Sequence, residues 1–269
     1  MTDSHSFMAA SKPTFILCFD FDGTLVHPDS DPVFHPSLGK MIQQLRAQGA
    51  AWVINTGRTL PQTVQGIAQY GIFMEPDYII ARECDIYRPG LFKKWTDFGN
   101  WNRLARKANE RFIKDHQKSL NAIREMVATT NASFLEGDEG ELGIVATSEE
   151  EMDTIATFIE THSSQFPDIG YQRNSIYLRF SHSGYSKGTA LSELARLLGL
   201  DAARCFAAGD NHNDISMLNP RHARMIATPS NGLPPIKEHV LKFGGFIATK
   251  PASEGMMEAL GHYFGGGQK

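Results

Sequence analysis

The sequence predicts an α/β protein: a doubly wound parallel sheet into which a smaller α+β segment is inserted. Three observations carry this prediction. Short apolar runs alternate with helical patterns near the start of the chain, the order of elements changes between about residues 85 and 183, and the alternation then resumes. With 269 residues, of which 41% are hydrophobic, the chain can form one large domain or two unequal ones.

The alternating parts of the chain contain runs with the length and composition of strands that are buried on both faces. Helical patterns lie between these runs. One helix is expected over 35–49, with a proline near its start and Gly49 just past its end, and another over 186–200, with leucines and alanines on one broad face. The strands are expected at 15–19, 51–54, 78–81, 204–208 and 223–227.

The middle of the chain follows a different order: helix, two strands, helix, two strands. Such an order predicts a second sheet with its own helices. The first helix is expected as one long element. The expected elements are a helix over 100–130, a hairpin over 133–148, a helix over 149–166 and a strand pair over 169–181.

This change of order divides the chain into parts. A flexible N-terminus is expected at 1–12, because nothing in it has the pattern of a helix or strand. Small residues at Pro89-Gly90 and Ser183-Gly184 are expected to absorb rotation between the parts. The core is expected at 13–84 and 184–269, and the inserted domain at 85–183.

Composition excludes several classes of partner. A formal net charge of -4 and the lack of any block of Lys or Arg give no electrostatic reason to expect nucleic acid. No run of 18 apolar residues and no export leader indicates a membrane. Cys18, Cys84 and Cys205 lie in or beside apolar runs without metal-ligand spacing, which favours reduced core cysteines and a cytoplasmic protein. The sequence does not indicate an oligomeric state.

Polar clusters follow the predicted strands at the edge of the sheet where ligands bind in such folds. Each cluster alone could be a turn or a helix cap. Four caps have no reason to gather at one edge in this order, so together they predict a functional site. They are Asp20-Phe21-Asp22-Gly23-Thr24, Asn55-Thr56-Gly57-Arg58, Ser186-Lys187-Gly188, and Gly209 to Asp214 in "GDNHND".

The four clusters resemble the signature motifs of the haloacid dehalogenase (HAD) superfamily. The segments "FDFDGTL" and "GDNHNDISML" are similar to those of its Cof-type phosphatases. The inserted segment resembles a type IIB cap, as found in sucrose-phosphate and trehalose-phosphate phosphatases. The resemblance extends over nearly the whole chain, although "SNG" and "ASEG" in the tail depart from the pattern of many relatives. It implies a HAD-like, Rossmann-type core and Mg²⁺-dependent hydrolysis of small phosphate monoesters, above all sugar phosphates.

The resemblance also implies the role of each catalytic residue. Asp20 is the nucleophile that forms an aspartyl-phosphate, and Asp22 is first the acid and then the base. Thr56 and Lys187 bind the non-bridging phosphate oxygens, one as a hydroxyl donor and one as a point charge. Two acids two residues apart share one face of an extended chain and repel each other, so a cation is expected beside them.

The expected cation is Mg²⁺, which prefers oxygen ligands and keeps several waters. Asp20, the main-chain carbonyl of Asp22, and Asp210 fit as ligands. Asp214 is expected to hold a metal-bound water or to orient Lys187 from outside the ligand shell.

Further residues of these motifs have two interpretations each. Gly57 and Arg58 follow Thr56 closely enough to meet the substrate, although an exposed arginine is the more common case. Asn231 is expected either to line the phosphate pocket or to form the turn before "GLPP". His212 is expected to be structural, and Asn213 to approach the metal shell.

Three other functions share parts of this pattern. A phosphomutase uses the same aspartyl-phosphate but needs a bisphosphate activator. A signalling receiver domain uses acids, Mg²⁺, Thr or Ser, and Lys, but it has no acid two residues after its phosphoacceptor and no inserted domain. A non-catalytic sugar-phosphate-binding protein could use the same fold, since fold alone does not prove activity. The retained set of acids favours the phosphatase.

Overall fold

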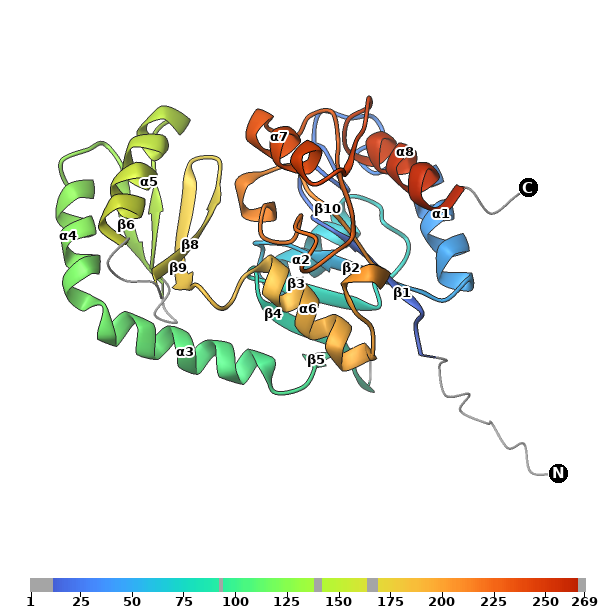
Figure 1. Ribbon diagram of the computed structural model, residues 1–269, viewed down its shortest axis with the longest axis horizontal. Coiled ribbons are helices and arrows are strands. Elements are labelled where there is room, and N and C mark those ends of the chain that lie inside the picture. The colour runs from blue at the N-terminus through green and yellow to red at the C-terminus, as the bar shows by residue number, and fades with distance from the viewer. Residues whose placement is uncertain (1–11, 92–93, 138–141, 164–168, 266–269) are drawn as a thin grey trace.

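The computed structural model describes residues 12–91, 94–137, 142–163 and 169–265. Within them the chain forms two sheets, one of eight strands and one of four, each with its own helices (Figure 1). The α/β fold expected from the sequence is confirmed. The flexible N-terminus expected at 1–12 lies, apart from residue 12, outside the described residues.

Six neighbouring strands of the large sheet are parallel, in the order β12-β11-β10-β1-β2-β3. The chain builds the sheet outward from β1 in one direction before the inserted segment and in the other direction after it. The point where the direction changes, between β1 and β10, is where ligands bind in open α/β sheets. These strands are β1 (Phe15–Phe19), β2 (Ala50–Asn55), β3 (Tyr78–Ala81), β10 (Cys205–Ala208), β11 (Met225–Thr228) and β12 (Phe246–Ile247).

Helices cover both faces of this sheet, which is why β1 and β2 are almost wholly apolar and buried. Pro36 starts α1 and a Ser186–Thr189 capping box starts α6, as the expected helices at 35–49 and 186–200 require. One face carries α1 (Pro36–Ala47), α2 (Leu60–Gln69) and α8 (Ala252–Phe264), and the other carries α6 (Lys187–Leu198) and α7 (Pro234–Lys242).

Two strands of the expected insert belong to the large sheet instead. β4 (Asp85–Pro89) pairs antiparallel with β3, and β5 (Trp95–Asp97) pairs with β4. The boundary expected at residue 85 therefore does not coincide with the end of the large sheet. The chain leaves this sheet only after Asp97. Pro89-Gly90 lies in this hairpin, where the Gly90 amide donates to the Lys94 carbonyl over 2.7 Å, and its role as a hinge stays a prediction. The division into domains remains a prediction.

The small sheet is antiparallel, in the order β6-β7-β9-β8, and helices cover one of its faces. The single long helix expected over 100–130 is wrong, because the chain breaks at His116 (φ −111°, ψ 20°) without a Pro or Gly to mark the break. The elements are α3 (Trp101–Asp115), α4 (Gln117–Val127), β6 (Ser133–Glu136), β7 (Leu142–Val145), α5 (Glu149–Ser163), β8 (Ile169–Asn174) and β9 (Tyr177–His182).

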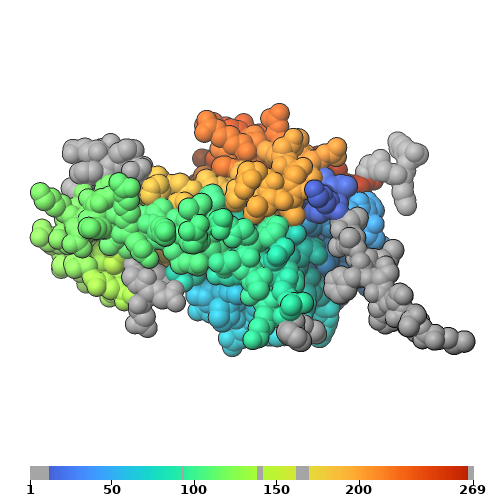
Figure 2. Space-filling view, turned by 90° about the horizontal axis from the view of Figure 1, so that it is seen from below, coloured from blue at the N-terminus to red at the C-terminus, as the bar shows by residue number. Residues whose placement is uncertain are grey.

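Within the described residues, the small sheet and its helices meet the large sheet mainly at two places. At one, α3 extends from the small sheet to the large one (Figure 1), and Figure 2 shows its green surface from below. At the other place, the β8–β9 turn packs on a short 3₁₀ helix, η3 (His212–Asp214), and the Ser175 amide donates to Asn211 Oδ1 over 3.4 Å. No helix in the described part of the chain is long and apolar enough to cross a membrane.

Candidate active site

The structure brings the four sequence motifs together at the carboxyl ends of the central strands. Asp20 directly follows β1, and its amide continues the ladder by donating to the Ala208 carbonyl over 2.8 Å. Thr56 directly follows β2, and its amide donates to the Ile80 carbonyl over 2.8 Å. Lys187 is the first residue of α6. Backbone hydrogen bonds thus fix the positions of the Asp20 and Thr56 Cα atoms.

Lys187 is fully buried and joins two of the motifs. Its ammonium lies 2.5 Å from Asp20 Oδ1 and 2.7 Å from Asp214 Oδ1, and 4.0 Å from Glu83 Oε2. Burial opposes the charge on Lys187, but the carboxylates of Asp20, Asp214 and Glu83 outweigh it and raise the pKa of the lysine well above its ordinary value. The ammonium is therefore a fixed positive charge in the site.

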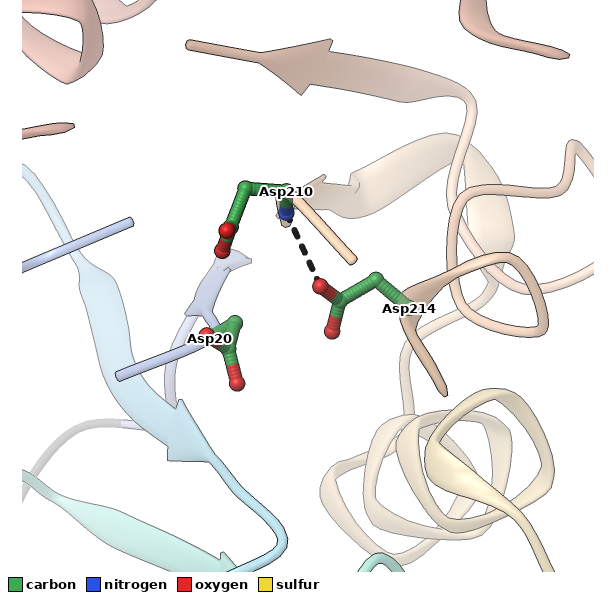
Figure 3. Close-up of side chains that lie close together, drawn as sticks. All are labelled: Asp20, Asp210 and Asp214. Atoms are coloured by element: carbon green, nitrogen blue, oxygen red, sulfur yellow. Dashed lines mark hydrogen bonds between the residues drawn. The ribbon is translucent and has the colours of Figure 1, made fainter. Parts of the chain in front are cut away.

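Three carboxylates surround a common space beside this lysine (Figure 3). One oxygen from each of Asp20, Asp210 and Asp214 lies within 4.8 Å of the others. Thr24 donates to Asp210 Oδ1 over 2.8 Å, so the threonine of the first motif orients an aspartate of the fourth. Asp214 Oδ2 accepts the amides of Asp210 and Asn211, each over 2.9 Å.

The donor set fits a divalent cation with oxygen ligands. Asp214 uses one oxygen for Lys187 and the other for two backbone amides, so it orients the lysine and the motif loop. Asp20 and Asp210 each keep an oxygen that no such bond occupies within the described contacts. Mg²⁺ takes one or two carboxylates and keeps waters, which matches two available aspartates and the Asp22 carbonyl.

The carboxylates carry an electrostatic cost that a cation would relieve. Burial raises the pKa of Asp20 well above its ordinary value, with Lys187 acting against the rise and Asp214 and Asp210 adding to it. Burial, and then the charge of Asp214, raises the pKa of Asp210 to about 7. A dication bound between them would favour the ionised forms.

Asp22 is held by Arg58 in a bidentate ion pair. Arg58 Nε donates to Asp22 Oδ2 over 2.7 Å, and Nη2 donates to Oδ1 over 2.6 Å. The guanidinium carbon lies 5.0 Å from the centre of the Phe21 ring, and the arginine side chain is 27% exposed. Arg58 is thus not a free surface arginine. Its ion pair fixes the position of the Asp22 carboxylate.

The second motif places a hydroxyl and a close backbone approach at the same edge. Thr56 is buried, and its Oγ1 accepts the Arg58 amide over 3.2 Å, which leaves the hydroxyl proton for another acceptor. A Cβ at Gly57 would lie 2.5 Å from Glu83 Oε1, so only glycine allows this carboxylate to approach. Gly57 therefore shapes the site whether or not it touches a substrate.

Asn231, in the C-terminal part of the chain, holds the turn that follows Asp22. Gly23 has φ +78°, and a Cβ there would clash with the Asp210 carboxylate. Asn231 donates to the Gly23 carbonyl over 2.8 Å, and its Oδ1 accepts the Ala252 amide over 2.9 Å. Both polar atoms of Asn231 thus serve the backbone, which supports the turn interpretation over contact with phosphate.

Two other residues of the fourth motif have clear surroundings. His212 is half-buried, and burial lowers its pKa; its amide donates to Asn211 Oδ1 over 2.8 Å. These contacts agree with a structural role. Asn213 is buried and donates to Glu83 Oε1 over 3.0 Å, so it faces a carboxylate rather than the aspartate cluster.

Sequence reasoning missed Glu83. This carboxylate is 6% exposed and lies beside Lys187, and its backbone has φ +72°, which L residues seldom adopt. Burial raises its pKa, with Lys187 acting against the rise. The signal was the cluster "RECD" directly after "YIIA", where two acids and an arginine follow a buried strand.

A cleft of about 1080 Å³ opens beside this group, between the edge of the large sheet, α3 and the small sheet. Thr59 and Glu83 line it from the large sheet, and Gln172, Arg179 and Ser181 line it from the small sheet. Because Glu83 also lies beside Lys187, the cleft adjoins the aspartate cluster.

Comparison with known proteins identifies the family to which a chain with this site belongs. A model of the haloacid dehalogenase-like hydrolases matches residues 17–82 and 100–249. The chain belongs to this family. The matched ranges contain all four motifs of this HAD-like hydrolase, whereas residues 83–99, with Glu83, β4 and β5, fall between them.

Individual relatives are more distant. A Streptococcus pyogenes protein that carries a phosphatase name is 24% identical over 275 residues, covering 91% of this chain and 96% of its own. The sucrose-phosphatase of Synechocystis, solved with sucrose and phosphate, has a TM-score of 0.71 at 17% identity, covering 93% of this chain and 98% of its own. A HAD subclass IIB sugar phosphatase has a TM-score of 0.64 at 17% identity, covering 93% and 99%. These structural likenesses establish the fold of the HAD-like hydrolase.

Proposed function

We propose that this hydrolase is a Mg²⁺-dependent phosphatase that cleaves phosphate monoesters of small metabolites, sugar phosphates in particular, through an aspartyl-phosphate on Asp20. The observation that carries the proposal is the buried Lys187, held between Asp20 and Asp214 beside Asp210. A fixed ammonium next to a cluster of carboxylates fits a site that receives a phosphate dianion together with a metal cation.

The residues divide the reaction into two displacements. In the first, an Asp20 oxygen attacks phosphorus, the bond from phosphorus to the leaving oxygen breaks, and Asp22 gives that oxygen a proton. In the second, Asp22 takes a proton from water, the water oxygen attacks phosphorus, and the bond to Asp20 breaks to release phosphate. Arg58 holds both Asp22 oxygens in the structure, so in this proposal Asp22 leaves Arg58 to give and take the proton.

The negative charges of the carboxylates and the phosphate explain why the site needs both the lysine and a metal cation. A carboxylate that approaches a phosphate oxygen to about 4 Å is repelled by about 4 kcal/mol per charge pair at an effective dielectric of about 20. Lys187 already offsets Asp20 and Asp214, so it cannot neutralise the substrate alone. Asp20 and Asp210 would hold Mg²⁺, which would supply the remaining positive charge.

The position of the small sheet supports the proposal that the substrate is a small molecule. Its β8–β9 turn contacts Asn211 in the fourth motif, and its open face lines the cleft beside Lys187. We include in the proposal that the chain between Asp97 and Lys187 is a cap domain that closes over the site. A closed chamber admits compact metabolites and excludes nucleic acids and phosphoproteins. The sugar phosphatases among the structural relatives support the same class.

A panel of substrates tests this proposal. Phosphate release is measured with Mg²⁺ on hexose phosphates, phosphoglycolate, phosphoglycerates, pyridoxal phosphate, nucleotides and a phosphopeptide. Asp20→Asn is the matched control, because it keeps the shape of the side chain but removes the attacking charge. We expect turnover of small metabolites by the native chain and none by Asp20→Asn. Turnover by Asp20→Asn at the native rate would disprove the covalent mechanism.

Two alternatives give different results in the same assay. A phosphomutase would move phosphate within a sugar and would need a bisphosphate activator. A binding protein would retain the sugar phosphate without releasing inorganic phosphate. No observation in the structure favours either over the phosphatase.

A further inference from the structure

The cleft beside Lys187 contains polar atoms that are buried but have no hydrogen-bond partner. Within the described part of the chain, three such atoms belong to residues that line it: Glu83 Oε2, Arg179 Nη1 and Ser181 Oγ. Glu83 and Ser181 are 6% and 7% exposed. A buried donor or acceptor without a partner costs about 1–3 kcal/mol, so a ligand that completes these bonds gains correspondingly.

The three atoms come from opposite walls of the cleft. Arg179 and Ser181 are two residues apart on β9, so their side chains share one face of the small sheet. Leu178 and Phe180 alternate with them and pack against the helices on the other face. Glu83 faces them from the turn after β3. A molecule in the cleft can therefore touch both sheets.

Glu83 also connects this group to the reacting centre. Its Oε2 lies 4.0 Å from Lys187 Nζ, and that nitrogen lies 2.5 Å from Asp20 Oδ1. A phosphoryl group on Asp20 thus has its leaving group within reach of the cleft. At about 1080 Å³ the cleft lies just above the range of ordinary ligand sites, which enclose roughly 300–1,000 Å³, so it has room for a small metabolite.

Charge distinguishes Arg179 from the other arginines that line the cleft. Arg82 lies 3.8 Å from Asp85, Arg106 lies 3.2 Å from Asp97, and Arg124 is paired with Glu136. Within the described residues, Arg179 has no ion pair closer than 4.0 Å, and its Nη1 is buried without an acceptor. The charge of Arg179 also acts on Glu83 and Asp85, which lie beyond ion-pair distance. With Nη1 unbonded, the guanidinium matches a planar carboxylate, which such a group can bind through two parallel hydrogen bonds.

We propose that this cleft binds the leaving group of the substrate and that the leaving group carries a carboxylate as well as hydroxyls, so that the substrate is a phosphorylated sugar acid. Arg179 binds the carboxylate. Ser181 donates to or accepts from a hydroxyl, and Glu83 accepts from a hydroxyl near the ester oxygen. This inference rests on the proposed phosphatase function and assigns the substrate class of the same site.

Matched substrate pairs test the role of Arg179. Glucitol 6-phosphate is compared with 6-phosphogluconate, and glycerol 3-phosphate with 3-phosphoglycerate, because both members of each pair are open chains that differ chiefly by a carboxylate. We expect the native chain to have the higher kcat/KM for the carboxylate of each pair. Arg179→Gln should lower kcat/KM for the carboxylates about 10- to 100-fold more than for the neutral partners. Arg179→Lys should recover part of this loss, because it restores the charge without the second hydrogen bond.

Arg106→Gln is the control variant. It removes a charge from the same cleft, but that arginine is paired with Asp97, so both members of a substrate pair should change by a similar factor. Equal losses of the two members in Arg179→Gln would overturn the proposal, as would a native preference for the neutral substrates.

Binding separates this inference from the catalytic one. Titration calorimetry with Asp20→Asn and Mg²⁺ measures the affinity for 6-phosphogluconate and glucitol 6-phosphate without turnover. We expect tighter binding of 6-phosphogluconate and loss of this preference in Asp20→Asn with Arg179→Gln. If 6-phosphogluconate bound more tightly but the native chain turned over neither compound, the phosphatase function would be refuted and the ligand class would stand. Equal affinities would refute the ligand class alone.

Discussion

Replacement of Lys187 by methionine tests whether this lysine neutralises the buried carboxylates. The variant keeps most of the side-chain volume but leaves Asp20, Asp214 and Glu83 without their ammonium. At an effective dielectric of about 20, charges at the observed 2.5 to 4.0 Å attract by about 4–7 kcal/mol each. Burial of the ammonium offsets much of this gain. Loss of one partner of a buried pair costs about 3–5 kcal/mol of the free energy of unfolding, which is the loss we expect at about pH 8.

The loss should depend on pH with a defined sign. Burial already raises the pKa of Asp20, and removal of the ammonium raises it further above the unfolded value. A group with a raised folded pKa destabilises the protein as pH rises through that pKa. At about pH 5 the carboxyls take up protons, so the difference between Lys187→Met and the native chain should shrink.

Urea unfolding followed by circular dichroism, in chelator from about pH 5 to pH 8, measures this difference. Lys40→Met is the matched control, since Lys40 is exposed on α1 and its loss should change the free energy by no more than about 0.5 kcal/mol. If Lys187→Met were as stable as Lys40→Met at about pH 8, the buried carboxylates would not depend on this ammonium, and the electrostatic account of the site would be refuted.

Three further predictions concern the acid, the metal and the cap. Asp22→Asn should lower kcat by about 10²–10⁴-fold, because it removes the acid and base, and should lower the melting temperature slightly, because it also breaks the partly exposed ion pair with Arg58; a native kcat would contradict the catalytic role. Chelator should stop phosphate release and Mg²⁺ restore it. Mg²⁺ should also raise the melting temperature more at about pH 8 than at about pH 5, because burial raises the pKa of Asp210 to about 7 and protons compete with the cation below it; an equal shift at both pH values would argue against Asp210 as a ligand. A disulfide between Ser175→Cys and Asn211→Cys should block turnover until it is reduced, because it would join the β8–β9 turn of the small sheet to the loop before η3 at the edge of the large sheet. The native cysteines are buried and should not compete, and full activity of the crosslinked chain would remove the lid role.

The sequence alone was sufficient for the parts of the site that depend on strand ends. Asp20, Thr56 and Asp210 each follow an apolar run, and the rule that parallel strands share a carboxyl edge brings them together. Which oxygen pairs with which cation could not be predicted, because that depends on side-chain rotamers. The bidentate pair between Arg58 and Asp22 is such a case.

The errors in the fold arise from contacts between distant segments. A short hairpin can add to either sheet, and only its pairing with β3 assigns β4 and β5 to the large one. The break at His116 has no Pro or Gly to mark it, so helical propensity could not reveal it. Glu83 was missed because its role depends on its approach to Lys187 and Asn213, which lie more than a hundred residues further along the chain.

The start of α6 has a mechanical consequence. β9 ends at His182 and Lys187 follows five residues later, so a displacement of the small sheet pulls on the backbone next to the ammonium. The capping box at Ser186 holds the first turn of α6 against such a displacement. Asn55, at the end of β2, donates to the Lys187 carbonyl over 3.1 Å. The Gly188 amide is tied to Ser216 over 3.2 Å. Because these hydrogen bonds hold the start of α6 to the large sheet, variants that loosen the contacts of the small sheet should leave the Lys187 ammonium in place between Asp20 and Asp214.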